Sequence, residues 1–273
     1  MRFLVLSIAV IFYLSGFSQE LKTKKVTTAN FKEIFTVDKT TQLESGDYLK
    51  IDKKSKDTLI SGTYINGVKS GIWRYFSKGN QLWMTYNFDQ KKFEKLPEEI
   101  SRIDSFIVKK EDSFLYEKVD SPPVYLGFKD EVEQIVIANF DIPKAIMEKR
   151  LSGISIASFV VDSNGKMKNF NRVMVFTTEV MTQMEQTFNR IKGDWVPAKV
   201  NGNPVESQVL LVYEIKPSGS KNLFPDDPKS IIAHFQYFGV TETKRSMGYV
   251  TRTVPIGDID FSKMRSNSKR FSK

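Results

Sequence analysis

The chain has 273 residues, of which 40% are hydrophobic and 27% are charged, the balance of an ordinary soluble globular protein. Cysteine is absent, which excludes disulfides, thiolate metal sites, a cysteine nucleophile and a lipid-modified N-terminal cysteine. The formal net charge of +9 would suit nucleic acid or an anionic membrane surface as a partner. Because the lysine and arginine residues are spread along the whole chain, solubility is the favoured interpretation, and we expect no nucleic-acid partner.

The N-terminus has the pattern of a signal peptide. Met1-Arg2 supplies a short positive region, residues 3–17 are almost continuously apolar, and small residues precede a cleavage position after Ser18. The apolar run is about 15 residues, short of the roughly 20 that span a bilayer comfortably. We therefore predict that residues 1–18 are removed and that the protein is periplasmic, or otherwise exported in a Gram-negative-type envelope. An uncleaved anchor helix is the alternative interpretation.

Residues 19–40 are polar and are predicted to form an extended lead-in, and residues 41–90 alternate short strands with tight turns. Asn66-Gly67 favours a type I′ hairpin, because both residues tolerate positive φ. One run in this region follows a regular pattern, carried by Gly62, Tyr64, Asn66, Gly67, Lys69, Gly71, Trp73, Tyr75, Phe76 and Gly79. This run resembles the MORN-like repeat of YwqK-type proteins, which implies stacked β-hairpins that pack on a neighbouring strand or on the next domain.

Residues 91–121 are charged and are predicted to link two modules, with Pro122-Pro123 as the boundary. The next part, residues 124–216, has the clearest periodicity. Its predicted elements are a helix over 128–139, a short helix from Pro143, strands over 154–161 and 167–176, a helix capped by Thr177 or Thr178, and a strand over 205–215. The predicted fold class is therefore α+β: a three-stranded antiparallel sheet with helices on one face, preceded by a small β-hairpin module.

Several short motifs occur in a fixed order along residues 122–216. They are Ile142-Pro143-Lys144-Ala145, Gly153 to Phe159, Val161-Asp162, Gly165, Trp195-Val196-Pro197-Ala198 and Asn201-Gly202-Asn203-Pro204-Val205. In spacing and order they resemble the TonB C-terminal domain family. The resemblance implies a domain that docks an extended segment of an outer-membrane transporter. It does not extend to energy transduction, because residues 19–121 contain no long proline-rich spacer.

The resemblance implies binding by strand addition, in which a free sheet edge pairs with a peptide backbone. The predicted partner-binding edge strand comprises Val209, Leu210, Leu211, Val212, Tyr213, Glu214 and Ile215. Core packing on both faces explains the same apolar run, and pairing with a second copy of the chain is a further alternative. Trp195 and Pro197 could form a binding platform, although covering and ending the preceding helix is the favoured interpretation.

No catalytic, metal or cofactor site is predicted. His234 is the single histidine, so a cluster of histidine ligands is excluded. The chain contains no nucleophile-elbow or phosphate-binding glycine motif. We therefore expect a protein that is not an enzyme and that needs no cofactor.

Residues 217–273 are predicted to be a basic and largely disordered tail, because lysine and arginine alternate with serine and asparagine near the C-terminus. The leading functional hypothesis is an exported protein–protein interaction module that binds an extended peptide or a second copy. Its partner would be an envelope protein, with an outer-membrane transporter as one candidate. The alternative is a structural envelope protein that attaches to membrane or cell wall through its hairpins and this tail.

Overall fold

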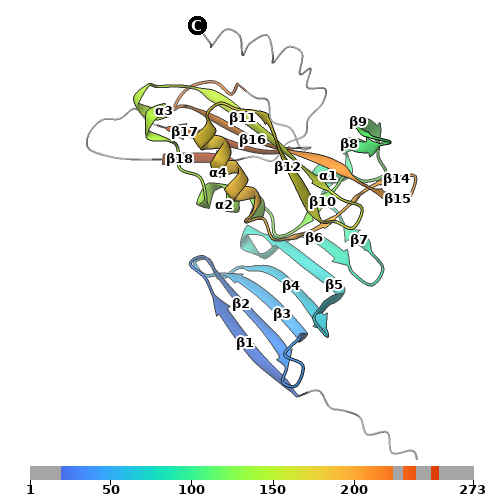
Figure 1. Cartoon of the computed structure of the whole chain (residues 1–273). Coiled ribbons are helices and arrows are strands. Elements are labelled where there is room, and N and C mark those ends of the chain that lie inside the picture. The colour runs from blue at the N-terminus through green and yellow to red at the C-terminus, as the bar shows by residue number, and fades with distance from the viewer. Residues whose placement is uncertain (1–19, 224–229, 238–246, 252–273) are drawn as a thin grey trace, which may run out of the picture.

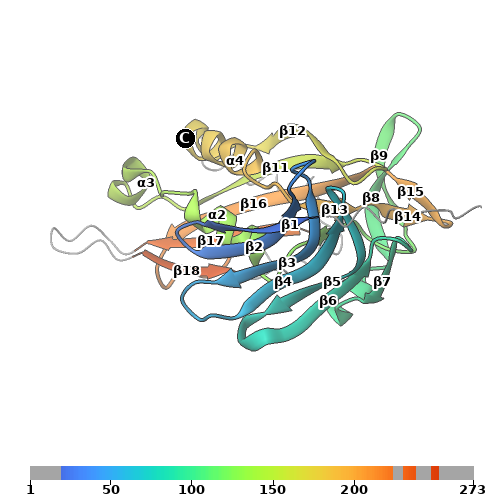
Figure 2. The same cartoon turned by 90° about the horizontal axis from the view of Figure 1, so that it is seen from below.

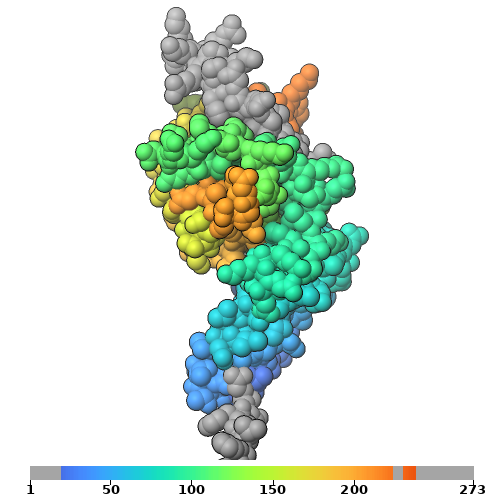
Figure 3. All heavy atoms as spheres, turned by 90° about the vertical axis from the view of Figure 1, so that its right-hand side faces the viewer, coloured from blue at the N-terminus to red at the C-terminus, as the bar shows by residue number. Residues whose placement is uncertain are grey.

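The computed structural model describes residues 20–223, 230–237 and 247–251. The chain consists mostly of strands, arranged in an N-terminal sheet and a second sheet that carries helices on one face (Figure 1). Figure 3 shows the N-terminal strands at one end of an elongated molecule and the second sheet at the other. The predicted α+β fold with a three-stranded sheet is therefore wrong, because both sheets are larger than expected.

The N-terminal sheet is a meander of seven antiparallel strands in chain order. The strands lie side by side when viewed from below (Figure 2). They are β1 (Leu21–Thr27), β2 (Phe31–Asp38), β3 (Glu44–Asp52), β4 (Thr58–Ile65), β5 (Val68–Ser77), β6 (Gln81–Asn87) and β7 (Lys92–Lys95), with a 3₁₀ turn, η1 (Lys78–Asn80), between β5 and β6. The predicted turn at Asn66-Gly67 is confirmed, since both residues have positive φ and join β4 to β5.

One face of this sheet is aromatic and buried. Trp73 is 1% exposed and stacks on Tyr48, with ring centroids 5.3 Å apart, while Tyr64 meets it edge to face at 5.0 Å. Gly62 lies opposite: a Cβ atom there would lie 2.2 Å from the Trp73 ring. The glycine is therefore required by the close approach of the indole to the neighbouring backbone. The alternation of large rings and small residues in the sequence builds this face.

The second sheet has five strands in the order β12-β11-β16-β17-β18, and a hairpin of two further strands attaches to β16 at Ser207. All its pairs are antiparallel except β16 with β17, which is parallel. The strands are β8 (Ser105–Lys110), β9 (Ser113–Lys118), β11 (Gly153–Val161), β12 (Met167–Met174), β16 (Ser207–Pro217), β17 (Ser230–Tyr237) and β18 (Met247–Thr251). Both faces of β16 are buried, which accounts for its nearly continuous apolar sequence.

The helices of the second module are α2 (Glu131–Ala138), α3 (Lys144–Glu148) and α4 (Thr178–Phe188), and they form one layer on the sheet (Figure 1). A short α1 (Glu98–Ser101) precedes β8. Thr177 caps α4, as predicted, by accepting a hydrogen bond from the Val180 backbone N–H. Val180, Met181 and Met184 then enter the main core with alternate residues of β11, β16 and β17.

Two small ladders lie outside the main sheets: β10 (Val124–Leu126) with β13 (Asp194–Val196), and β14 (Ala198–Val200) with β15 (Asn203–Val205). Val124, Leu126 and Val196 pack with the aromatic face of the N-terminal sheet. The two modules are also joined by an ion pair of 2.7 Å between Lys50 and Glu131, whose side chains are about nine-tenths buried. The interface between the modules is therefore a packed core rather than a flexible linker.

Three parts of the predicted organisation need correction. Residues 21–38 were expected in the lead-in but form β1 and β2. The predicted linker, residues 91–121, contains the whole of β7, α1, β8 and β9. Residues 230–237, expected in the disordered tail, form β17 inside the second sheet. Residues 1–18 and the basic residues near the C-terminus lie outside the described residues, so the signal peptide stays a prediction.

Candidate functional site

The predicted partner-binding strand is not at the edge of its sheet. Residues 209–215 lie in β16, which pairs with β11 along one side and with β17 along the other. Their backbone groups are therefore used inside the sheet, and strand addition at this position is excluded by the two neighbours. The alternative of core packing agrees with the burial of all seven residues.

The sequence alone could not show whether this strand lies at the edge or in the interior of the sheet. A strand at the edge of a sheet and a strand in its interior can have the same apolar sequence, and the distinction depends on which other segment pairs with it. The second neighbour, β17, comes after residues 218–229, beyond the expected end of the domain. Tyr237 holds the end of β17 in place by donating a 2.7 Å hydrogen bond to the Leu151 carbonyl.

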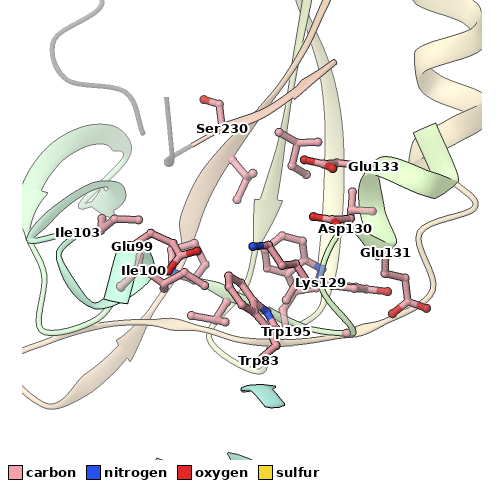
Figure 4. Close-up of a pocket in the computed structure, with 18 of the residues that line it drawn as sticks. Trp83, Glu99, Ile100, Ile103, Lys129, Asp130, Glu131, Glu133, Trp195 and Ser230 are labelled. Carbon is pink, nitrogen blue, oxygen red and sulfur yellow. The ribbon is translucent and has the colours of Figure 1, made fainter. Parts of the chain in front are cut away.

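A cavity lies where the two modules meet, and we call it the junction pocket. Its volume is about 440 Å³, within the range of about 300–1,000 Å³ found for ligand pockets. Residues far apart in the sequence line it, from β6, α1, β8, β10, α2, β13, β16 and β17. Figure 4 shows Trp83 and Trp195 on one side of the pocket and Ser230 on the opposite side. The rest of the lining is largely apolar, including Ile100, Ile103, Phe106, Val124, Phe128 and Val209.

Two buried polar atoms of this lining have no hydrogen-bond partner among the described residues. They are Nε1 of Trp195, whose side chain packs against the Tyr125 and Phe159 rings, and Oγ of Ser230. Trp195 is 8% exposed and Ser230 is 2% exposed. Because a buried polar group without a partner is costly, these atoms are places where a bound molecule could donate or accept a hydrogen bond. Trp195 therefore packs against neighbouring rings and also lines the pocket, while its role as a binding platform stays a prediction.

A second group of polar residues is buried between β16 and β17. Glu214 and Lys216 are 0% exposed and His234 is 3% exposed. The Glu214 carboxylate lies 2.5 Å from His234 Nδ1 and 3.4 Å from Lys216 Nζ. It also accepts a 2.5 Å hydrogen bond from the Leu223 backbone N–H, and Lys216 donates a hydrogen bond to Asn222. We call Glu214, Lys216 and His234 the buried charge cluster.

The environment of Glu214 keeps its carboxylate ionised. Burial raises the pKa of this group, but four effects together outweigh it: the His234 hydrogen bond, the Leu223 N–H, and the electrostatic effects of Lys216 and of His234. The resulting pKa lies below the ordinary value of 4.5. The cluster therefore compensates buried charges with one another, an arrangement that needs all its members.

Sequence reasoning found neither the junction pocket nor the buried charge cluster. For the cluster a signal existed, because Glu214 and Lys216 interrupt an otherwise apolar strand at a spacing of two, which places both on one face. Their partner His234 lies in β17, directly opposite Glu214 in the parallel register. For the pocket no local signal existed, because its lining comes from separate segments.

Among the described residues there is no group of three or more His, Cys, Asp or Glu side chains arranged to hold a metal ion. None of the helices in the described ranges has the length and apolar character needed to cross a bilayer. Comparisons with protein-family models, with curated proteins and with solved structures find no match for the chain. The resemblances to the TonB C-terminal domain and to the MORN-like repeat therefore stay predictions.

Proposed function

We propose that this chain is an exported binding protein that holds a segment of another envelope protein in the junction pocket. The observation that carries the proposal is the pocket itself, a largely apolar cavity between two modules with two buried polar atoms lacking partners. Pockets of this composition bind through apolar contact and obtain orientation from a few polar groups. Export is supported by the signal-peptide pattern of residues 1–18.

The position of the pocket supports a macromolecular ligand. Its lining combines the fully packed junction with exposed side chains, among them Glu99, Lys129 and Asp130. Recognition of a protein segment typically uses such an apolar centre surrounded by a polar rim. The rigid connection between the modules, through the buried Lys50–Glu131 pair, would keep the pocket formed before a ligand arrives.

The first test asks whether the cavity accepts an apolar guest. Nile red, an uncharged dye whose emission increases in apolar surroundings, should bind the full chain and quench the fluorescence of Trp83 and Trp195. Val132→Trp adds a large side chain to the pocket lining and should abolish dye binding. The matched control, Val173→Trp, lies at an exposed β12 position and should bind the dye normally. Equal binding by both variants would contradict the proposed site.

The second test asks whether the pocket meets a protein in the cell. A photo-crosslinking amino acid at Ile100, in the pocket lining, should form a covalent adduct with an envelope protein. The same residue at Ile72, which is 40% exposed on β5, should not form that adduct. Combining the Ile100 crosslinker with Val132→Trp should remove the adduct. Persistence of the adduct in the combined variant would show that the contact lies outside the pocket and would overturn the proposal.

A further inference from the structure

The junction pocket has an excess of negative charge in its lining. Glu99, Asp130, Glu131 and Glu133 supply carboxylates, and Lys129 supplies the single ammonium group of the lining. Glu131 is neutralised by its ion pair with Lys50. Glu99 and Asp130 are exposed and form no ion pair within the described part of the chain. These two carboxylates therefore give the rim of the pocket a negative potential that faces solvent.

Carboxylates also lie near the buried tyrosines of the junction. Burial raises the pKa of Tyr125, a pocket residue, and the charges of Glu131 and Asp194 raise it further. The same two carboxylates raise the pKa of Tyr75, behind the effect of its burial. Both carboxylates already have cationic partners, Glu131 in Lys50 and Asp194 in Lys69, so the negative charge available to a ligand is that of Glu99 and Asp130 at the rim.

The aromatic rings at the junction already receive ammonium groups. Lys129 Nζ lies 4.7 Å from the centre of the Trp83 ring, which is part of the pocket lining. Lys50 Nζ lies 5.4 Å from the centre of the Phe128 ring, also in the lining. Contacts of this length are attractive through the negative face of the ring. The remaining aromatic residues of the lining are Phe106, Tyr125 and Trp195, and such rings can offer the same contact to a bound cation.

The two polar atoms without a partner indicate which hydrogen-bonding groups the ligand should carry in addition to its cation. Nε1 of Trp195 can only donate a hydrogen bond, so it needs an acceptor on the ligand. Oγ of Ser230 can donate or accept. A peptide bond supplies a carbonyl acceptor and an N–H donor together, whereas a simple alkylamine supplies no acceptor.

From these observations we infer that the junction pocket selects a basic apolar segment of polypeptide, in which a Lys or Arg side chain lies beside apolar side chains. This inference rests on the proposed function and adds the chemical class of the ligand. The apolar side chains fill the cavity, the cationic group lies among the carboxylates and rings, and the peptide backbone reaches Trp195 and Ser230.

The test compares two short peptides, capped at both ends, of alternating leucine and lysine or of alternating leucine and glutamate. Isothermal titration with the full chain at low ionic strength should show binding of the lysine peptide and little or none of the glutamate peptide. Added salt should weaken the binding, since part of the attraction is between exposed charges. Butylamine, which carries the cation without a peptide backbone, should bind much more weakly. Equal affinity for the two peptides, or for butylamine and the lysine peptide, would overturn the inference.

A variant of the rim carboxylates distinguishes the contribution of charge to peptide binding from the contribution of the cavity. Glu99→Gln with Asp130→Asn removes two exposed charges and should lower the affinity for the lysine peptide by about fivefold. The variant should still bind Nile red, because the cavity is unchanged. Unchanged peptide affinity in this variant would count against the inference. If the unmodified protein binds Nile red and Val132→Trp does not, but neither peptide binds the unmodified protein, the ligand class is overturned and the pocket stands. If the unmodified protein does not bind Nile red, the pocket itself is overturned.

Discussion

Replacing Glu214 by glutamine is expected to lower the free energy of unfolding by about 3–5 kcal/mol, the usual cost of removing one partner from a buried ion pair. The substitution keeps the shape of the side chain but leaves the buried Lys216 without its counter-charge. His234 also loses the charge on the acceptor 2.5 Å from its Nδ1. Urea unfolding followed by circular dichroism measures the loss directly. The change is large for a protein whose total stability is of the order of 5–15 kcal/mol.

Glu185→Gln is the matched control. Its partner Arg172 forms an ion pair of 2.9 Å, but both side chains are about half exposed, so the expected loss is under about 1 kcal/mol.

The effect of Glu214→Gln should also depend on pH. Because the pKa of Glu214 is lowered by folding, its stabilising contribution is present above the ordinary pKa of 4.5 and is lost as the pH falls through the lower folded value. The unmodified protein and Glu214→Gln should therefore have similar free energies of unfolding at strongly acidic pH. A difference between them that is independent of pH would mean that the cluster acts by packing alone.

Replacing Trp73 by alanine should cost about 3–5 kcal/mol, the range found for removing a buried aromatic ring. The ring is 1% exposed and contacts Tyr48, Tyr64 and Phe88. Its Nε1 also donates a 3.2 Å hydrogen bond to the Thr63 carbonyl, which would lose its partner. Because the aromatic face is the surface on which β10 and β13 pack, we expect the junction to loosen with the N-terminal sheet.

The neighbouring residue on β5 provides the control. Ile72 is 40% exposed on the opposite face, so Ile72→Ala should change the free energy of unfolding by no more than about 0.5 kcal/mol. Thermal unfolding by circular dichroism avoids the tryptophan signal that the substitution removes. Nile red binding should weaken in Trp73→Ala and stay normal in Ile72→Ala. A fully stable Trp73→Ala protein would show that the aromatic face is not a core.

Local elements were largely predictable from the sequence, whereas their assembly was not. The helix periodicity over residues 128–139, the Thr177 cap and the positive φ at Asn66-Gly67 are encoded by neighbouring residues, and each is found. The strands β11 and β12 also lie where alternation predicted them. Such features depend on interactions within a few positions of the chain.

The elements that escaped prediction are those whose stability depends on distant partners. β1 is largely exposed and rich in lysine, so its sequence resembles a solvated loop, and only its pairing with β2 makes it a strand. β17 was placed in the tail because it follows a linker-like stretch, yet its alternate residues complete the main core. The same reason applies to the junction pocket, since no single segment contains more than part of its lining.

The parallel pairing of β16 with β17 has a consequence for how the chain folds as it is synthesised. A parallel neighbour cannot follow through a tight hairpin, so β16 has to wait until residues 230–237 have emerged and returned to its side. Until then β16 presents an apolar edge that can pair with other chains. The meander of β1 to β7, built from sequential neighbours, has no such delay. We therefore expect the N-terminal sheet to form first and the second module to need protection from aggregation until β17 has paired with β16.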